Sequence, residues 1–216
     1  MDIKKFKQLP ILGILRGIEP DIFEPLLSAI DSAGLKTIEI TMNTKGAAEL
    51  IRKAVTLSKK RLTIGAGTVL DMRSLKLALD AGATFIVMPV LILEVMEYCT
   101  KNRIPVFPGA LTPQEIYTAW RAGATIVKVF PSNFFGPKYF KELKGPFNDV
   151  ELMACGGVTP QNLKTYFANG ASAVSFGASV FKKEWLSQKD FPSITQSIKK
   201  YIQEYTAAAL TDNSTE

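Results

Sequence analysis

The sequence contains no histidine among its 216 residues. A chain without histidine cannot build a Ser-His-Asp triad or a Cys-His nucleophile pair, because both use an imidazole as the base. It also lacks the histidine ligands of the usual catalytic zinc sites, and no compact acidic cluster suggests a Mg²⁺ site. Proton transfer must therefore be carried out by Glu, Asp, Lys, Tyr, Cys or water.

Cysteines and long apolar runs are also scarce. The two cysteines, Cys99 and Cys155, make no disulfide framework, which fits a reducing compartment. No apolar run approaches the ~20 residues that a membrane span needs. The start of the chain, Met1-Asp-Ile-Lys-Lys, lacks the apolar core of a signal peptide. We therefore expect a cytoplasmic protein without a membrane partner.

The net charge is +6, but the lysines and arginines are scattered rather than clustered. A nucleic-acid interface needs basic residues gathered on one face, so we expect no nucleic-acid partner and a mild preference for anionic substrates. The length and the 47% apolar content fit one globular domain. We expect this domain to span residues 1–208, and we expect the polar tail at 209–216 to be disordered.

Strand-like and helix-like segments alternate along the whole chain. Pro20, Pro113 and Pro160 mark expected helix starts, and glycines such as Gly34 and Gly123 mark expected ends. Eight strands in about 216 residues predict a (β/α)8 TIM barrel, with a doubly wound open sheet as the alternative. The predicted strands are Ile11–Leu15, Thr37–Thr41, Leu62–Gly65, Phe85–Met88, Ile104–Phe107, Thr125–Phe130, Glu151–Ala154 and Ala173–Phe176.

Lys128 interrupts an otherwise β-branched and aromatic strand. Such a strand is typical of a parallel sheet that is buried on both faces, where charged lysines are rare unless paired. Loss of hydration favours the neutral amine, which is a nucleophile that forms Schiff bases. An edge strand with Lys128 facing water is the competing interpretation. If Lys128 points into a barrel, Ile126 and Phe130 also point inward and Val127 and Val129 face the helices.

Glu39 occupies the corresponding position in Thr37-Ile-Glu-Ile-Thr41. If Ile38 and Ile40 face the helices, Glu39 points into the barrel as Lys128 does. A buried carboxylate near a lysine can act as a general base, although a structural ion pair or a solvated charge would give the same pattern. We favour the catalytic interpretation because two inward ionisable groups occur on separate strands.

Several predicted strand ends carry groups suited to an anionic substrate. Arg16 ends the first strand and offers a bidentate fork for a carboxylate. Gly65-Ala-Gly-Thr68 allows a close backbone approach and adds a hydroxyl. The turns Cys155-Gly-Gly157 and Phe176-Gly-Ala-Ser179 follow the seventh and eighth strands, where barrels frequently bind phosphate. Without a histidine base, Cys155 is expected to pack rather than to react, and a plain turn or surface arginine remains the alternative for each feature.

The ordered set of motifs resembles the family of 2-keto-3-deoxy-6-phosphogluconate (KDPG) and 4-hydroxy-2-oxoglutarate aldolases over about residues 10–205. Each motif alone is weak, but the set in this order is specific. The motifs are Ile14-Leu-Arg-Gly17, Ile38-Glu-Ile-Thr41, Gly65-Ala-Gly-Thr-Val69, Met88-Pro89, Val106-Phe-Pro-Gly109, Val127-Lys-Val-Phe-Pro131, Gly145-Pro-Phe147, Gly156-Gly-Val158 and Gly177-Ala-Ser179.

The resemblance implies a homotrimeric class I aldolase that needs no metal or other cofactor and binds pyruvate and a 2-keto-3-deoxy sugar acid phosphate. It implies Lys128 as the Schiff-base lysine and Glu39 as the general acid/base. The implied pyruvate pocket holds Arg16, Thr68 and Pro89. The implied phosphate site consists of Gly156, Gly157, Gly177 and Ser179.

Two departures from the family pattern affect the part of the site beyond pyruvate. Asn43 stands where many KDPG aldolases carry arginine, and Ala154-Cys155 replaces a Pro-Thr pair. Other segments look similar to the 2-keto-3-deoxy-6-phosphogalactonate branch, so KDPG, its C4 epimer and 4-hydroxy-2-oxoglutarate are all candidate substrates. A non-covalent phosphate-barrel isomerase or synthase and an inactive sugar-phosphate binder are more remote alternatives.

Overall fold

The computed structural model describes residues 1–212, with side chains through residue 208. Its last helix, α10 (Phe191–Asp212), continues in the backbone to the end of that range. The tail that we expect over 209–216 otherwise lies outside the described residues.

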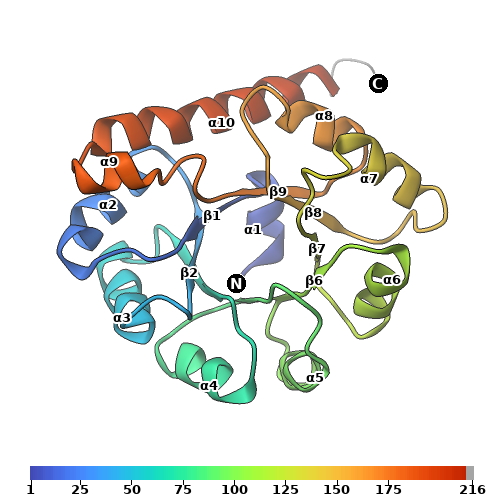
Figure 1. Ribbon diagram of the computed structural model, residues 1–216, viewed down its shortest axis with the longest axis horizontal. Helices are drawn as coiled ribbons and strands as arrows, with labels where there is room; N and C mark the ends of the chain where they lie inside the picture. The colour runs from blue at the N-terminus through green and yellow to red at the C-terminus, as the bar shows by residue number, and fades with distance from the viewer. Residues whose placement is uncertain (213–216) are drawn as a thin grey trace.

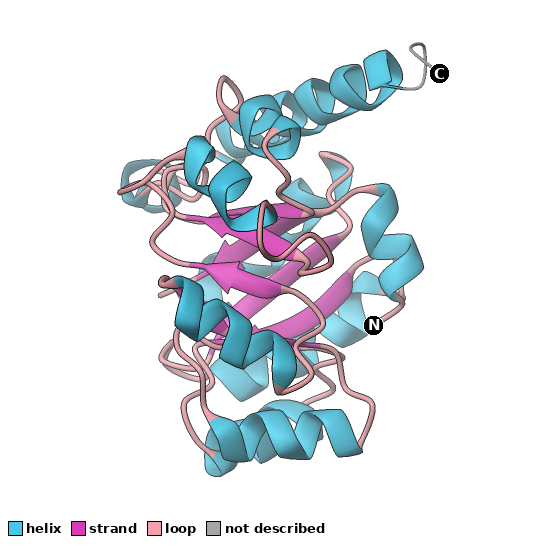
Figure 2. Ribbon diagram, turned by 90° about the vertical axis from the view of Figure 1, so that its right-hand side faces the viewer, coloured by secondary structure: helices cyan, strands magenta, loops and turns pink. Residues whose placement is uncertain are grey.

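Parallel strands form a barrel surrounded by helices (Figures 1 and 2). The sheet order is β5-β4-β3-β2-β1-β9-β8-β7-β6. The strands are β1 (Ile11–Leu15), β2 (Thr37–Thr41), β3 (Thr63–Gly67), β4 (Ile86–Val87), β5 (Val106–Phe107), β6 (Gly109–Ala110), β7 (Val127–Val129), β8 (Leu152–Cys155) and β9 (Ala173–Phe176).

The two edge strands, β5 and β6, are consecutive in the chain and separated by Pro108. The amide of Met88, beyond β4, donates to the Phe107 carbonyl at 3.0 Å, whereas the amide of Lys128 in β7 donates to the Pro108 carbonyl at 2.8 Å. Adjacent carbonyls of one segment therefore bond to strands on opposite sides. This arrangement closes the (β/α)8 barrel that we predicted and rules out the open doubly wound sheet.

The outer layer consists of helices that follow the strands in turn (Figure 1). The helices before α10 are α1 (Ile3–Gln8), α2 (Pro20–Ser32), α3 (Ala47–Ser58), α4 (Met72–Asp80), α5 (Leu93–Lys101), α6 (Pro113–Arg121), α7 (Pro137–Lys144), α8 (Leu163–Ala168) and α9 (Lys183–Ser187). Among the described residues, no helix is both long and apolar enough to cross a membrane.

Proline, capping and glycine residues in the sequence predict most of these helix boundaries. Pro20 and Pro113 begin α2 and α6, and Thr112 and Glu115 form a capping box at the start of α6. Glycines in the left-handed conformation follow four of the helices, as their positions just before strands predict. These glycines are Gly34, Gly82, Gly123 and Gly170.

The predicted helix start at Thr159-Pro160 is wrong, because α8 begins only at Leu163. The Asn162 side chain accepts a hydrogen bond from the Thr159 amide at 2.8 Å and donates one to the Gly157 carbonyl at 2.9 Å. These two bonds hold residues 157–162 in a turn. β4, β5 and β7 have only two or three residues and are shorter than predicted, and β6 corresponds to none of the eight predicted strands.

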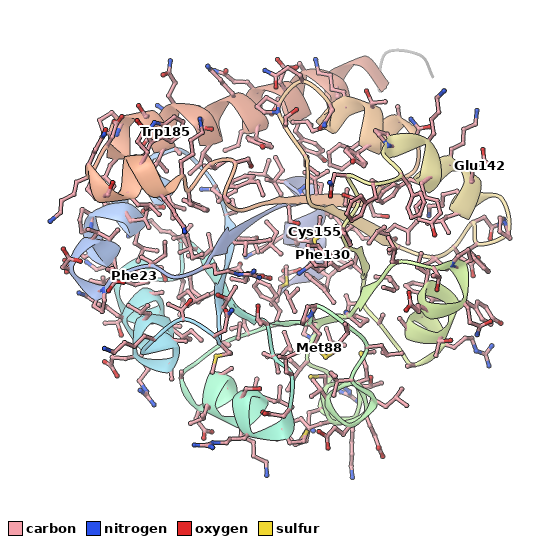
Figure 3. The ribbon with its side chains drawn as sticks, in the orientation of Figure 1. Phe23, Met88, Phe130, Glu142, Cys155 and Trp185 are labelled. Atoms are coloured by element: carbon pink, nitrogen blue, oxygen red, sulfur yellow. The ribbon has the colours of Figure 1, made fainter. Side chains whose placement is uncertain are left out.

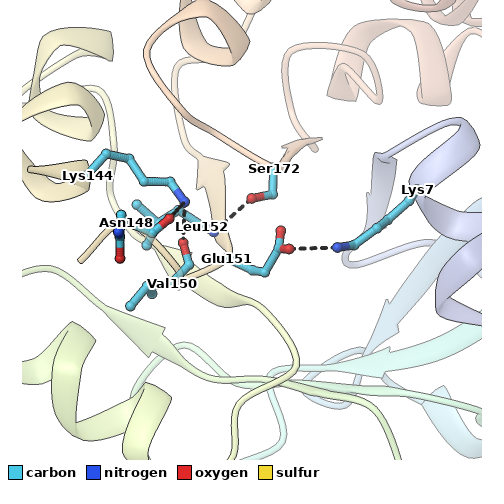
Figure 4. A network of polar contacts seen from close by, with 7 residues as sticks. All are labelled: Lys7, Lys144, Asn148, Val150, Glu151, Leu152 and Ser172. Atoms are coloured by element: carbon cyan, nitrogen blue, oxygen red, sulfur yellow. Dashed lines mark hydrogen bonds and ion pairs between the residues drawn. The ribbon is translucent and has the colours of Figure 1, made fainter.

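A short helix that the sequence analysis did not identify, α1, covers the barrel interior at one end. Asp2 caps this helix by accepting from the Lys4 amide at 2.9 Å. Phe6 is buried in a cluster of inward-facing residues and lies against Phe107, with ring centroids 6.0 Å apart. Lys7 forms an ion pair at 2.6 Å with Glu151, which is the residue just before β8 (Figure 4). The barrel therefore has an apolar interior at this end, and any ligand must enter from the other.

Candidate active site

The alternation along β7 places Lys128 inside the barrel. Val127 and Val129 belong to the core between the strands and the helices, whereas Ile126 belongs to the interior cluster with Phe6. The prediction for this strand is confirmed, and its alternative, an edge strand facing water, is excluded. Only 4% of Lys128 is exposed. Its Nζ lies 5.2 Å from the ring centroid of Phe130, a residue that sits over the middle of the barrel in Figure 3.

Glu39 points inward from β2 in the same way, because Ile38 and Ile40 pack against the helices. Only 1% of Glu39 is exposed, and its Oε2 has no hydrogen-bond partner among the described residues. Burial raises the pKa of Glu39, while the charges of Lys128 and then Arg16 act in the opposite direction. A buried carboxylate with a free oxygen and two cations nearby is suited to taking up and releasing a proton.

Gly67 provides the space that the Glu39 carboxylate occupies. The two strands pair in register, with Glu39 beside Gly65 and Thr41 beside Gly67. A Cβ atom on Gly67 would overlap Oε1 of Glu39 and lie 2.6 Å from its Cδ. The sequence analysis assigned the Gly65-Ala-Gly-Thr68 glycines to backbone approach toward a ligand. In the structure Gly67 instead accommodates a catalytic candidate, and Gly65 accommodates the ring of Phe85.

Arg16 and Thr68 lie together although 52 residues separate them. Arg16 Nη2 donates to Thr68 Oγ1 at 3.4 Å, and Thr68 has a left-handed backbone with a φ of 55°. The turn after Arg16 is fixed by Thr44, which accepts a hydrogen bond from the Gly17 amide at 2.9 Å. Arg16 itself is exposed, so its guanidinium is accessible to an incoming carboxylate.

Pro89 follows β4 and is half-buried. A Cβ atom on Gly109 would overlap the Pro89 carbonyl, so the close approach of these two segments requires glycine at position 109. Gly109 pairs with Lys128 in the sheet. The Pro89 turn is thereby brought toward the strand that carries the lysine.

A cavity of about 490 Å³ opens above Lys128 and brings six of the ten predicted site residues together. These six are Arg16, Lys128, Gly156, Gly157, Gly177 and Ser179. Glu39, Thr68 and Pro89 lie outside this lining. Asn43 is exposed in the turn after β2 and also lies outside it.

The glycine loop after β8 is held in place by the segment after β7. Ser132 does not line the cavity. Its Oγ donates to the Gly156 carbonyl at 2.8 Å, and its amide donates to the Cys155 carbonyl at 2.8 Å. Gly156 and Gly157 both have positive φ values, 99° and 72°, which side-chain-bearing residues rarely adopt. The loop therefore presents backbone rather than side chains to the cavity.

Tyr201 of α10 contacts the loop after β9 through its hydroxyl group. Tyr201 donates its hydroxyl proton to the Val158 carbonyl at 2.7 Å, and its oxygen lies 3.3 Å from Ser179 Oγ. This single tyrosine links both glycine-containing loops to the last helix.

The cavity also includes residues that the sequence analysis did not assign to the site. Phe130 and Ser175 point inward by strand alternation, a signal that was available for both. Cys155 lines the cavity while 4% exposed, beside Phe130 over the barrel centre in Figure 3. Lys183 comes from the loop-to-helix segment after β9, where no periodic pattern indicated its orientation. Among the described residues, no group of three or more Cys, Asp or Glu side chains could hold a metal ion.

Comparison with known proteins agrees with this geometry. Residues 3–197 match the family model described as KDPG and KHG aldolase. The chain is 33% identical over 195 residues to the 2-dehydro-3-deoxy-6-phosphogalactonate aldolase of Escherichia coli K12, covering 90% of this chain and 95% of that protein. It is 39% identical over 163 residues to the 2-dehydro-3-deoxy-phosphogluconate aldolase of Pseudomonas aeruginosa PAO1, covering 74% and 71%.

A solved structure described as "Native KDPGal structure" superimposes with a TM-score of 0.87 at 32% identity, covering 94% of this chain and 97% of that one. A parallel barrel with an inward lysine and carboxylate, together with these matches, defines a carbon–carbon lyase of the aldolase class. The chain belongs to the KDPG and KHG aldolase family.

Proposed function

We propose that this protein cleaves 2-keto-3-deoxy-6-phosphogluconate to pyruvate and glyceraldehyde 3-phosphate through a Schiff base on Lys128. The observation that carries the proposal is the pair of buried, oppositely charged side chains that point into one barrel from β2 and β7. Among the described side chains no ion pair joins Glu39 to Lys128, and Glu39 Oε2 has no hydrogen-bond partner. An oxygen without a partner supports a role for Glu39 in proton transfer.

In this mechanism the Lys128 amine attacks the C2 ketone and forms a carbinolamine, which loses water to give the imine. Glu39 transfers the protons that these steps require. The protonated imine accepts electrons as Glu39, directly or through water, removes the C4 hydroxyl proton. The C3–C4 bond then breaks, and glyceraldehyde 3-phosphate leaves. The remaining enamine is protonated at C3 and hydrolysed to pyruvate, which regenerates the free lysine.

In this proposal Arg16 and Thr68 bind the carboxylate of the keto acid. The hydrogen bond between the Arg16 guanidinium and the Thr68 hydroxyl supports this assignment. In this proposal the phosphate is bound through backbone amides and a hydroxyl of the glycine loops, and their place in the cavity lining supports the assignment. The residues concerned are Gly156, Gly157, Gly177 and Ser179. The half-buried Pro89 turn adds apolar contact near the reacting carbon.

The C4 epimer, 2-keto-3-deoxy-6-phosphogalactonate, is the second candidate substrate. It is a candidate because the galactonate aldolase of E. coli is 33% identical to this chain and aligns with 90% of it. Both substrates undergo the same bond cleavage, so Lys128 and Glu39 keep their roles in either case.

The chemistry is tested by trapping. Protein incubated with pyruvate and sodium borohydride is analysed by intact mass and peptide mapping. One adduct with the mass of a reduced pyruvate imine on Lys128, lost in Lys128→Ala and kept in Lys182→Ala, is expected. An adduct that is absent, or spread over surface lysines, would overturn the Schiff-base proposal.

The substrate is tested separately by a pyruvate-coupled assay with KDPG, its galactonate epimer and 4-hydroxy-2-oxoglutarate. The highest kcat/KM is expected with KDPG, and a higher value with the epimer would reassign the protein to the galactonate series. If 4-hydroxy-2-oxoglutarate ranks first, the phosphate part of the proposal fails.

We also infer that the protein is a homotrimer in the cytoplasm, as the resemblance to the family implies. Light scattering coupled to size exclusion should give three times the 23.7 kDa chain mass. A monomeric mass in the active preparation would contradict the assembly without affecting the chemistry.

A further inference from the structure

The cavity above Lys128 is lined by cations and by no anion. Its charged lining residues are Arg16, Lys128 and Lys183, and none of the described lining residues is acidic. Glu39 lies outside the lining and balances part of the charge on Lys128 and Arg16. The third cation, Lys183, shares an adjoining cavity with the carboxylates of Glu19 and Asp21 but forms an ion pair with neither of them. Three cations around the main cavity suit it to a ligand with more than one negative charge.

Lys183 begins α9, four residues after Ser179, and lines the same cavity as the glycine loops. Together with Gly17 and Leu186 it also lines an adjoining cavity of about 360 Å³, so it lies at the wall that the two cavities share. An exposed lysine at this position can turn its ammonium toward a ligand at little cost.

The neighbouring lysines are already engaged, whereas Lys183 is not. Lys182 holds its Nζ 4.1 Å from the ring centroid of Trp185, and Lys189 forms an ion pair with Asp21 at 3.3 Å. In the part of the chain with described side chains, no carboxylate forms an ion pair with Lys183. The lysine that faces the cavity is thus the one left available to a ligand.

We propose that Lys183 is a specificity-determining residue that selects substrates carrying a terminal phosphate. This inference rests on the proposed function, since it assigns the distal end of the substrate to this side of the cavity. Backbone amides of the glycine loops bind an anion but bring no net charge. The ammonium of Lys183 supplies the positive charge that distinguishes a phosphate dianion from the neutral hydroxyl of an unphosphorylated analogue.

The test compares Lys183→Gln with wild type on KDPG, on the galactonate epimer and on unphosphorylated 2-keto-3-deoxygluconate. Because Lys183 is exposed and its charge is screened by salt, we expect KM for the phosphorylated substrates to rise about tenfold with kcat nearly unchanged. The kinetics with the unphosphorylated analogue should not change. Lys183→Arg should restore the low KM, and Lys182→Gln, which removes a neighbouring charge outside the cavity, should match wild type.

Inorganic phosphate provides a readout that does not depend on turnover. Its dissociation constant, measured by calorimetry, should be about tenfold weaker for Lys183→Gln than for wild type and for Lys182→Gln. If wild type cleaves KDPG or its epimer but Lys183→Gln has the wild-type KM, the role of Lys183 is overturned while the proposed function stands. If wild type cleaves none of the substrates, the proposed function fails, and unchanged phosphate binding in Lys183→Gln then overturns the role of Lys183 as well.

Discussion

The Glu39 side chain on β2 extends toward Gly67 on the neighbouring strand β3, and its carboxylate fills the volume that a larger side chain at position 67 would occupy. The carboxylate position is therefore determined by a residue that itself carries no reactive group. We therefore expect substitutions at Gly67 to affect catalysis, although Gly67 does not line the cavity.

Gly67→Ala should displace the Glu39 side chain and lower kcat by at least about tenfold, because a small misplacement of a catalytic group is costly. Overpacking should also lower the free energy of unfolding by about 1–3 kcal/mol. Lys76→Ala, at an exposed position on α4 and outside the cavity lining, is the control. Equal kinetics for the two variants, with both folded by circular dichroism, would contradict this role of Gly67.

Glu39→Gln should keep pyruvate binding but lower turnover by about 10²–10⁴-fold, because a positioned acid–base group contributes that much. The reaction needs the carboxylate form. Since burial raises the pKa of Glu39, wild-type kcat/KM should fall on the acid side at a pH above the ordinary value of 4.5. A pH–rate profile that is flat down to pH 4.5 would show that Glu39 is not the group that titrates.

The same burial has a consequence for stability. Because the folded-state pKa of Glu39 is raised, the folded state binds more protons than the unfolded state between 4.5 and that raised value, and stability falls as pH rises through this window. Glu39→Gln should therefore unfold at a higher temperature than wild type at neutral pH. The difference should shrink as pH is lowered toward 4.5, as thermal melts at several pH values would show. Glu49→Gln, at an exposed position on α3, should show no such trend.

Arg16→Lys should weaken capture of the keto acid, since lysine keeps the charge but loses the bidentate fork. The measurement is the pyruvate concentration that gives half-maximal borohydride trapping on Lys128. We expect this concentration to rise about tenfold, because one charge-assisted hydrogen bond is lost. Arg121→Lys, at the end of α6 and away from the cavity, should leave this concentration unchanged. An unchanged value in Arg16→Lys would remove Arg16 from the pyruvate pocket.

Phe6→Ala should destabilise the protein by about 3 kcal/mol, because it removes a buried aromatic side chain from the closed end of the barrel. Its effect on kcat should be small, since α1 lies at the end opposite the cavity. Lys5→Ala, on the exposed face of the same helix, should leave stability within about 0.5 kcal/mol of wild type. Urea unfolding of both variants measures the difference.

Strand alternation made the barrel interior predictable from the sequence. The period of two places Glu39 and Lys128 on the same side as Thr37 and Ile126, and the structure has them there. Positive-φ glycines such as Gly123 similarly ended helices where the sequence predicted. Both signals are local, because backbone geometry alone fixes which face a residue takes and where a helix can end.

Barrel closure, by contrast, depended on tertiary structure, because the carbonyls of Phe107 and Pro108 bond to strands from opposite edges of the sheet. The start of α8 at Leu163 likewise depended on side-chain hydrogen bonds, because Asn162 bonds to the backbone of Gly157 and Thr159 in the turn before the helix. Neither effect has a periodic signature in the sequence.

The sequence by itself determined the barrel class and the inward lysine and carboxylate, since these follow from alternation and composition along single strands. Only the tertiary structure decided that Gly67 makes room for Glu39, that Asn43 lies outside the cavity and that Lys183 lines it. These relationships join residues on different strands and loops, and the distances between such residues are set by how the whole barrel packs rather than by any local preference.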